Sequence, residues 1–321
     1  MSIAGAAAAV AASGSAAMSA AVVAARRDRA QRVQGRAAQR LAELGDRAVV
    51  LDLYDGGGAQ RYHELVRGDH SEVREVLASV RSRPGPVLEL AAGSGRLTLP
   101  LVAAGFDVTA IDLSDPMLAI LRAELAALPS GRGARCRVVR ADMTRFRVRG
   151  RFTTVVVGAS STSLLDDDGR ARMLDRVRRH LAPDGVLLLS TAVRGGAGGD
   201  GAHGRSGTAA DDAAGTAADD AEEVTPLPDG GVVHEYWPVG APERTVTVFP
   251  APADGADGAD GADGADGAGP LEVFTSTVRV LPVERLRADL ERAGLRVVRV
   301  QRVRSDVRTR HALELLEAVP S

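Results

Sequence analysis

The segment ELAAGSGRLTL, residues Glu89 to Leu99, places two glycines directly after an apolar run that has the character of a buried strand. Glycine adopts tight-turn conformations without steric cost and lets the backbone approach a bound group closely. After Gly95 the apolar residues return to helical spacing, so the segment predicts a strand, a sharp turn and a helix. Several cofactors that contain an adenosine or other nucleoside unit bind at such a turn, and the surrounding residues distinguish between them.

Strand and helix patterns alternate on both sides of the glycine turn. Helical spacing brings Val73, Val76 and Val80 onto one face, and Ser114 is placed to cap a second helix over residues 113–128. Predicted strands lie at residues 85–90, 106–112, 136–142, 152–160 and 186–191. This order predicts an α/β fold with a mostly parallel sheet, helices on both faces, and a ligand site beyond the carboxyl ends of the strands.

The composition of the 321 residues predicts one domain with low-complexity parts. Residues 1–47, rich in alanine and arginine, are expected to form a disordered tail, because a secretory signal would carry positive charge before its apolar stretch rather than after it. Residues 48–319 are expected to hold the folded domain, interrupted by low-complexity insertions at 195–223 and 251–269. Residues 196–269 carry 15 acidic residues against two arginines, so an acidic insert interrupts a basic body.

Several classes of site and partner are excluded by composition. The single cysteine, Cys136, rules out an internal disulfide framework, and no group of His and Cys has metal-ligand spacing, so we predict a cytoplasmic protein without a metal. The apolar N-terminal stretch is too weakly apolar to span a bilayer. Aromatic residues make up only 3% of the chain, which leaves few stacking platforms for bases, so we expect neither membrane nor nucleic acid as a partner. The oligomeric state stays unknown at this point.

The spacing around the glycine turn favours one cofactor. A Walker-type phosphate loop ends in Gly-Lys-Ser/Thr, and the chain contains no lysine. A dinucleotide fingerprint needs a third glycine where Thr98 stands, which leaves a nicotinamide-dependent reductase as an alternative with half a match. S-adenosylmethionine fits better: Glu89 ends the first strand, and Asp112, which ends the second, is placed to hold the ribose hydroxyls. Asp142 and Met143 follow the third strand at the level expected for the adenine ring.

Four segments in order carry a family resemblance: VLELAAGSG, VTAIDLS, VVRADM and LAPDGVLLLST. Through them the chain, over roughly residues 54–319, resembles the class I S-adenosylmethionine-dependent methyltransferases. The resemblance implies a Rossmann-like seven-stranded sheet whose last strand, HALELLEAV, runs antiparallel after LRVVRVQRV. It also implies an added antiparallel meander of VVHEYWPV, TVTVFPA and LEVFTSTVRVL. Ala91 replaces the first glycine of the family's turn, and we expect this position not to need a positive φ.

The same resemblance implies a set of cofactor-binding residues. Tyr54 and Tyr62, which precede the sheet, are expected to form a lid over the cofactor. The whole predicted set is Tyr54, Tyr62, Glu89, Ala91, Gly93, Gly95, Asp112, Leu113, Met117, Asp142, Met143 and Ser160.

Two observations indicate which group accepts the methyl: the segment after the fourth strand and a second family resemblance. That segment reads GASSTSLL, not the Asn/Asp-Pro-Pro-aromatic motif of methyltransferases that act on nucleic-acid bases. The stretch LYDGGGAQRYHELVRGDHSEV and its continuation to Leu101 are similar to the methyltransferases of daptide biosynthesis. This implies dimethylation of a primary amine at the terminus of a ribosomal precursor peptide. A small-molecule O- or N-methyltransferase of another pathway and a non-catalytic cofactor-binding scaffold stay open as alternatives.

An amine acceptor must lose a proton before it attacks the methyl group. An alkyl amine with a pKa of about 10.4 is protonated at pH 7, and freeing its lone pair costs roughly 4 to 5 kcal/mol. Burial lowers such a pKa, and a nearby side chain takes the proton. The candidates for that side chain are His63, Ser160, Ser161, His234 and Tyr236. The sequence does not select among them, so the catalytic base stays unassigned.

Overall fold

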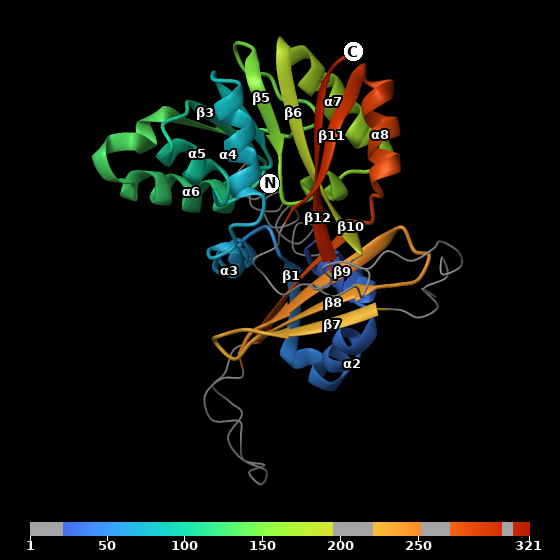
Figure 1. Ribbon diagram of the computed structural model, residues 1–321. Helices are drawn as coiled ribbons and strands as arrows, with labels where there is room; N and C mark the ends of the chain where they lie inside the picture. The colour runs from blue at the N-terminus through green and yellow to red at the C-terminus, as the bar shows by residue number, and fades with distance from the viewer. Residues whose placement is uncertain (1–21, 195–220, 252–269, 304–310) are drawn as a thin grey trace, which may run out of the picture. The chain divides into compact units, whose positions relative to one another are not determined.

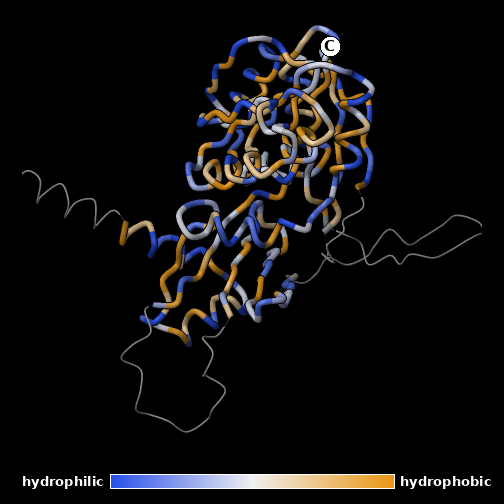
Figure 2. Tube along the Cα trace, turned by 90° about the vertical axis from the view of Figure 1, so that its left-hand side faces the viewer, coloured by the Kyte–Doolittle hydropathy of each residue, from blue (hydrophilic) through white to orange (hydrophobic). Residues whose placement is uncertain are grey.

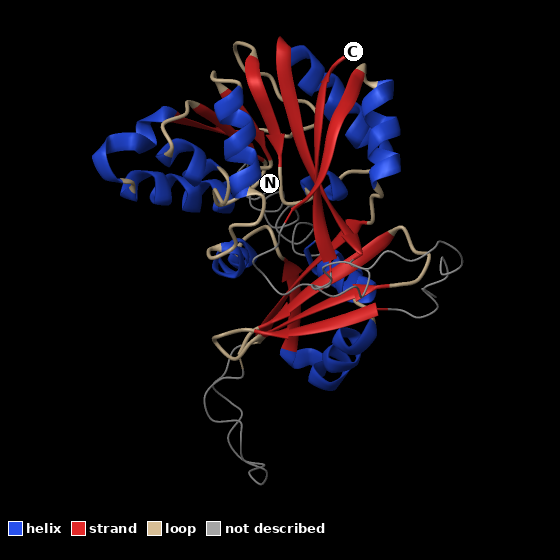
Figure 3. Cartoon of the chain, viewed as in Figure 1, coloured by secondary structure: helices blue, strands red, loops and turns tan. Residues whose placement is uncertain are grey.

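The computed structural model describes residues 22–194, 221–251, 270–303 and 311–321 (Figure 1). These residues divide into two compact units, which we name the seven-stranded unit and the five-stranded unit after their sheets. As far as they are described, Tyr54–Asp219, Val239–Glu243 and Val278–Ser321 belong to the seven-stranded unit, and Met1–Leu53, Asp220–Pro238 and Arg244–Thr277 to the five-stranded unit. Figure 3 shows the helices and strands of each.

The sheet of the seven-stranded unit has the order β11-β12-β6-β5-β2-β3-β4. β2 pairs in parallel with β3 and β5, β3 pairs in parallel with β4, and β5 with β6. β12 runs antiparallel to both of its neighbours, β6 and β11. The strands are β2 (Val87–Leu90), β3 (Val108–Asp112), β4 (Cys136–Arg140), β5 (Phe152–Val157), β6 (Leu181–Arg194), β11 (Leu295–Val303) and β12 (His311–Pro320). The predicted fold class and the antiparallel last strand are therefore confirmed.

Helices accompany this sheet along its whole width (Figure 1). α5 and α6 contact β3, α7 contacts β6, and α8 contacts β11. Ser114 caps α6 as predicted, because its Oγ accepts the Met117 N–H at 3.3 Å. The helices are α3 (Gly57–Val66), α4 (Val73–Ser82), α5 (Thr98–Ala103), α6 (Asp115–Ala127), α7 (Asp167–His180) and α8 (Val283–Arg292), with 3-10 turns η2 (Pro129–Arg135) and η3 (Ser161–Leu164).

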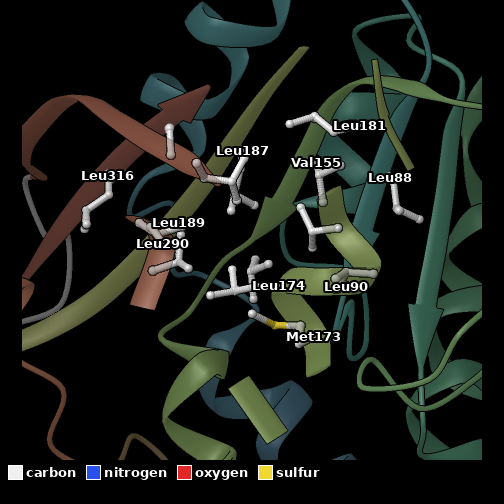
Figure 4. Packing of buried hydrophobic residues seen from close by; sticks show 14 of the residues in the cluster. Leu88, Leu90, Val155, Met173, Leu174, Leu181, Leu187, Leu189, Leu290 and Leu316 are labelled. Atoms are coloured by element: carbon white, nitrogen blue, oxygen red, sulfur yellow. The ribbon is translucent and has the colours of Figure 1, made fainter. Parts of the chain in front are cut away.

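The core of this unit lies between the central strands and the helices α7 and α8. Leu88, Val155 and Leu187 from three adjacent strands pack with Met173 of α7 and Leu290 of α8 (Figure 4). All five side chains are fully buried. Burying each side chain of this size contributes about 1.5 to 3 kcal/mol, which holds the parallel strands rigidly beneath their carboxyl ends. In Figure 2 the apolar colour is concentrated on such interior segments.

The five-stranded unit is a separate sheet in the order β1-β10-β9-β8-β7. β7, β8 and β9 form an antiparallel meander, and β1 runs parallel to β10. On one face, Val33 and Ala37 pack against Phe249 and Val273 of the sheet. The elements are α2 (Gly35–Leu44), η1 (Gly45–Arg47), β1 (Ala48–Asp52), β7 (Ala221–Pro226), β8 (Val232–Trp237), β9 (Glu243–Phe249) and β10 (Leu271–Arg279).

Two boundaries differ from those predicted. The expected disordered tail, residues 1–47, contains a helix at 22–32 and α2, which packs on the five-stranded sheet. The apolar residues of α2 lie on one helical face, but this apolar face is hard to recognise in a sequence composed largely of alanine and arginine. The insertion predicted at 195–223 ends earlier, because β7 begins at Ala221. Residues 1–21, 195–220 and 252–269 lie outside the described residues.

The domain expected over residues 48–319 is also divided differently. β1, at its start, pairs with β10 in the five-stranded sheet, so this sheet contains a strand from before the glycine turn as well as the predicted meander. Along the described parts of the chain, no helix has both the length and the apolar character needed to cross a membrane.

Candidate active site

The turn after β2 places three residues in the left-handed region of backbone space. φ is +54° at Ala91, +55° at Gly93 and +101° at Gly95. The expectation for Ala91 was wrong, because this turn forces even a residue with a Cβ into a positive φ. The two glycines adopt a positive φ without strain, but at Ala91 it costs about 1 to 3 kcal/mol and persists only where the surroundings hold it, typically at ligand sites.

The two glycines of the turn serve different purposes. A Cβ on Gly95 would lie 2.6 Å from Cδ1 of Leu121, so this glycine allows α6 to pack closely on the turn. A Cβ on Gly93 would meet no atom within 4 Å, so the backbone there faces open space. The open side of Gly93 is where a bound group can approach the main chain.

Asp112, the last residue of β3, holds this turn through its carboxylate. Its Oδ2 accepts the Gly93 N–H at 2.8 Å, and its Oδ1 accepts the Ser114 N–H at 2.9 Å. Burial raises the pKa of Asp112, while these backbone hydrogen bonds act in the opposite direction. Leu113, the next residue, is 60% exposed. An acid and an exposed apolar side chain therefore follow each other beside the open glycine.

Asp142 follows β4 and is held by its own loop. Its Oδ1 accepts hydrogen bonds from the N–H and hydroxyl of Thr144, and its Oδ2 accepts one from Arg145 at 2.9 Å. Burial acts to raise the pKa of Asp142, but these hydrogen bonds outweigh it and hold the pKa below its usual value. Met143 packs against the core beside it, and Met117 is almost fully buried in α6.

Glu89 is a buried acid inside β2. Only 3% of it is exposed, and the Thr98 hydroxyl donates to its Oε2 at 2.5 Å. Burial raises the pKa of Glu89 to about 8, with the Thr98 hydrogen bond acting against this rise. At neutral pH this carboxyl group therefore holds its proton, beneath the turn that Asp112 clamps.

The two tyrosines predicted to form a lid contact each other. The rings of Tyr54 and Tyr62 lie 5.2 Å apart, edge to face. Burial raises the pKa of Tyr62, and the neighbouring Tyr54 raises it further, so Tyr62 is a neutral phenol. Arg96, directly after the glycine turn, acts to lower the same pKa, so Tyr62 lies within electrostatic reach of the turn.

A buried ion pair beside the turn was missed from the sequence. Glu72 is fully buried at the start of α4, and its Oε1 accepts hydrogen bonds from the Arg96 guanidinium and from the Ala159 N–H, the latter at 2.7 Å. Arg96 also donates to the Ser71 carbonyl at 2.6 Å. A signal was available in the segment GSGR, where an arginine opens an otherwise apolar helix start.

The loop after β5 lies next to the glycine turn, because β5 pairs with β2. Its backbone is strained. Both Ala159 and Ser160 have positive φ, +52° and +56°. The Ser160 N–H donates to the Ser190 hydroxyl at 3.2 Å, and the Ser161 hydroxyl donates to the Gly158 carbonyl at 2.8 Å. The Ser160 hydroxyl itself is buried without a hydrogen-bond partner among the described residues. Of the predicted proton acceptors, Ser160 is the one adjacent to the turn with such an unmatched oxygen.

The other predicted proton acceptors have partners elsewhere. The Nε2 of His63 lies 3.6 Å from Oε1 of Glu124 on α6. His234 and Tyr236 lie on β8 in the five-stranded unit. The Nδ1 of His234 is 3.4 Å from Glu222, and burial lowers its pKa. Within the seven-stranded unit, His63 therefore lies against α6 and not in the loop after β5.

Known proteins resemble this chain in sequence and fold. The methyltransferase domain family matches residues 87–185. The crystal structure of the glycopeptide N-methyltransferase MtfA with S-adenosyl-L-homocysteine is 31% identical, covers 90% of this chain and 99% of that chain, and has a TM-score of 0.57. CcbJ from Streptomyces caelestis, 21% identical over 78% of this chain and 90% of its own, shares the fold with a TM-score of 0.58.

Among curated proteins, glycine/sarcosine N-methyltransferase of Halorhodospira halochloris is 32% identical over 156 residues. That alignment covers 46% of this chain and 56% of the relative. The putative methyltransferase YqeM of Bacillus subtilis (strain 168) is 27% identical over 136 residues, or 41% of this chain and 53% of the relative. The chain thus spans little more than half the length of these curated relatives.

The chain belongs to the class I S-adenosylmethionine-dependent methyltransferases. MtfA has been crystallised with S-adenosyl-L-methionine as well, and S-adenosylmethionine is the cofactor of this chain. The residues around the turn fit this cofactor: Gly93 faces open space, Asp112 offers a carboxylate, and Leu113 offers an exposed apolar surface.

Proposed function

We propose that the protein methylates an amine nitrogen of a peptide. The observation that carries this proposal is the likeness to the glycopeptide N-methyltransferase MtfA, which extends over 90% of this chain rather than over the cofactor-binding half alone. The glycine/sarcosine N-methyltransferase relative supports nitrogen as the acceptor atom. The finer proposal is dimethylation of a primary amine at the terminus of a ribosomal precursor peptide, which rests on the resemblance of Leu53 to Leu101 to the daptide methyltransferases.

Bound S-adenosylmethionine supplies an electrophilic methyl group on a sulfonium. We infer that Asp112 and the open side of Gly93 bind the ribose side, that Leu113 and Asp142 bind the adenine side, and that Tyr54 and Tyr62 cover the site. No covalent enzyme intermediate is needed, so the contribution of these residues is orientation and the exclusion of water.

Ser160 is the side chain we propose to receive the acceptor amine. Its hydroxyl is buried and lacks a partner among the described residues, and an unmatched buried oxygen is stabilised by any N–H that reaches it. A serine hydroxyl is neutral, so it orients an amine that already carries a free lone pair. Burial of the amine in this loop lowers its pKa and supplies part of the roughly 4 to 5 kcal/mol needed at pH 7.

The test is mass spectrometry of the reaction product. The protein is incubated with S-adenosylmethionine and one acceptor at a time. The acceptors are a peptide with a free N-terminal amine, the same peptide with that amine acetylated, a peptide with a C-terminal amine, and a small amine. Fragmentation then locates the methyl group. We expect transfer to a free amine and none to the acetylated peptide. A methyl group on a carboxylate or hydroxyl oxygen would overturn the amine proposal, and transfer to small amines alone would overturn the peptide proposal.

The same protein sample also distinguishes an enzyme from the alternative of a non-catalytic cofactor-binding scaffold. A scaffold would bind S-adenosylhomocysteine in a calorimeter yet yield no methylated product with any acceptor. A nicotinamide-dependent reductase would bind NADH instead. We expect heat of binding with S-adenosylhomocysteine and none with NADH.

A further inference from the structure

Glu72 joins two loops, the one that carries the glycine turn after β2 and the one that follows β5. Its Oε1 accepts the Ala159 N–H from the loop after β5 and a hydrogen bond from Arg96, the residue that follows the glycine turn. Gly158 has no room for a side chain, because a Cβ there would overlap the side chain of Leu97. The cofactor-side turn and the loop after β5 are therefore in contact, and a single carboxylate oxygen binds both.

This arrangement is costly for stability. A carboxylate that leaves water loses several kcal/mol of hydration, which an ion pair offsets only with good geometry and matched hydrogen bonds. Glu72 is 0% exposed, its φ is +60°, and its Oε2 has no partner among the described residues. Ala159, the residue it holds, is itself at a positive φ. Strain and an unmatched oxygen at the same place indicate a role beyond stability.

We propose that Glu72 is a positioning residue for methyl transfer. Through the Ala159 N–H it fixes the left-handed backbone of Ala159 and Ser160, and through Arg96 it fixes that backbone relative to the cofactor-side turn. The proposal rests on the proposed function, because it assigns the Ser160 side of the site to the acceptor. Glu72 touches neither reactant and acts through these two neighbours.

The proposal separates turnover from cofactor binding. The cofactor-side contacts at Gly93 and Asp112 do not include Glu72. A displacement of the acceptor by about 1 Å is enough to slow a positioned reaction about 100-fold. Loss of the Glu72 contact with Ala159 is therefore expected to lower kcat while the affinity for S-adenosylhomocysteine stays nearly constant.

Three substitutions at Glu72 test the contact. Glu72→Ala removes it, and Glu72→Asp keeps the charge but shortens the side chain so that it no longer reaches Ala159. Glu72→Gln keeps an oxygen acceptor in place of Oε1. We expect kcat to fall roughly 100-fold in the first two and less than about 10-fold in Glu72→Gln, with the Kd for S-adenosylhomocysteine within about threefold of wild type in all. Asp69→Asn is the matched control, since Asp69 lies 3.6 Å from Arg96 but has no bond to Ala159.

A second readout does not require the acceptor to be known. Hydrogen exchange of the S-adenosylhomocysteine-bound protein is expected to be faster in Glu72→Asp over residues 157–163 and unchanged over 91–95. Unchanged exchange at 157–163, or a cofactor affinity that falls together with kcat, would overturn the positioning role. Absence of wild-type turnover with every amine would instead overturn the proposed function, and the exchange result would still decide the role of Glu72.

Discussion

Asp112 and Glu89 are two acids on adjacent strands that the fold treats differently. Asp112 sits at the carboxyl end of β3 with two backbone N–H donors on its carboxylate, whereas Glu89 lies inside β2 with one hydroxyl donor. Donors stabilise the ionised form and burial opposes it. The balance favours the proton on Glu89, whose pKa is about 8. The two carboxyl groups therefore differ in protonation, and each is tested by its own substitution.

Asp112→Ala is expected to weaken binding of S-adenosylhomocysteine tenfold or more. A charge-assisted hydrogen bond to a ribose hydroxyl is worth about 1.5 to 3 kcal/mol, and the substitution also releases the Gly93 N–H that Asp112 holds. Calorimetry measures the Kd. Asp107→Ala, an exposed acid just before the same strand, is the control and leaves the Kd unchanged. An unchanged Kd for Asp112→Ala would remove this residue from the site.

Glu89→Gln is expected to raise the melting temperature more at pH 8.5 than at pH 5. The raised pKa of Glu89 means that the folded state keeps a proton between pH 4.5 and about 8 that the unfolded state has lost. Its contribution to stability is complete below pH 4.5 and is lost as the pH rises through about 8. Glutamine keeps an acceptor for Thr98 and has no proton to lose. Equal shifts at both pH values would show that Glu89 is ionised when folded.

The turn after β2 combines two requirements at the scale of one element. Gly95 must be small because α6 packs on it, and Gly93 must leave space on the side that faces no protein atom. Ala91 shows that this turn tolerates a Cβ at a positive φ. Stability and ligand binding are therefore assigned to different glycines.

Gly95→Ala is expected to lower the free energy of unfolding by about 1 to 3 kcal/mol, because its Cβ would lie 2.6 Å from Cδ1 of Leu121. Gly93→Ala is expected to cost about 1 kcal/mol of stability but to weaken cofactor binding more than tenfold, because its Cβ projects into the open space. Urea unfolding and calorimetry measure the two effects. The opposite ranking in either measurement would contradict this division.

The central strands and the glycine turn could be predicted because each is encoded locally. Strands such as Val87–Leu90 are short apolar runs between turn residues, and Asp112 lies at a fixed distance from the turn. The contact of Glu72 with Ala159 could not be predicted, since it joins residues 87 positions apart. Alanine rarely adopts the positive φ found at Ala91, and the pairing of β1 with β10 joins distant segments, so neither has a local signal.

At the scale of the whole molecule, the five-stranded sheet is assembled from separate stretches of the chain. β9 ends at Phe249 and its neighbour β10 begins at Leu271, with the ADG repeat between them. The linker role predicted for this repeat concerns residues outside those that the structure describes. Its effect on stability is nevertheless testable through the two strands that it connects.

Deletion of residues 253–267 is expected to leave the cofactor affinity unchanged and the melting temperature the same or slightly higher. If the repeat is the linker that its composition predicts, shortening the connection between the two strands from 21 to 6 residues lowers the entropic cost of loop closure by roughly 1 kcal/mol, in favour of the folded state. Scanning calorimetry measures the change. A scrambled repeat of equal length is the control, and a fall of several degrees on deletion would show that the repeat is part of the folded structure.

The position of β12 has a consequence for synthesis on the ribosome. This strand lies between β6 and β11 and pairs with residues 187–194, which are translated more than a hundred residues earlier. Until it emerges, β6 presents an unpaired, apolar strand edge to the cell, and such edges template aggregation. A nascent chain stalled before His311 therefore still exposes this edge to chaperones, even when the glycine turn after β2 has already formed.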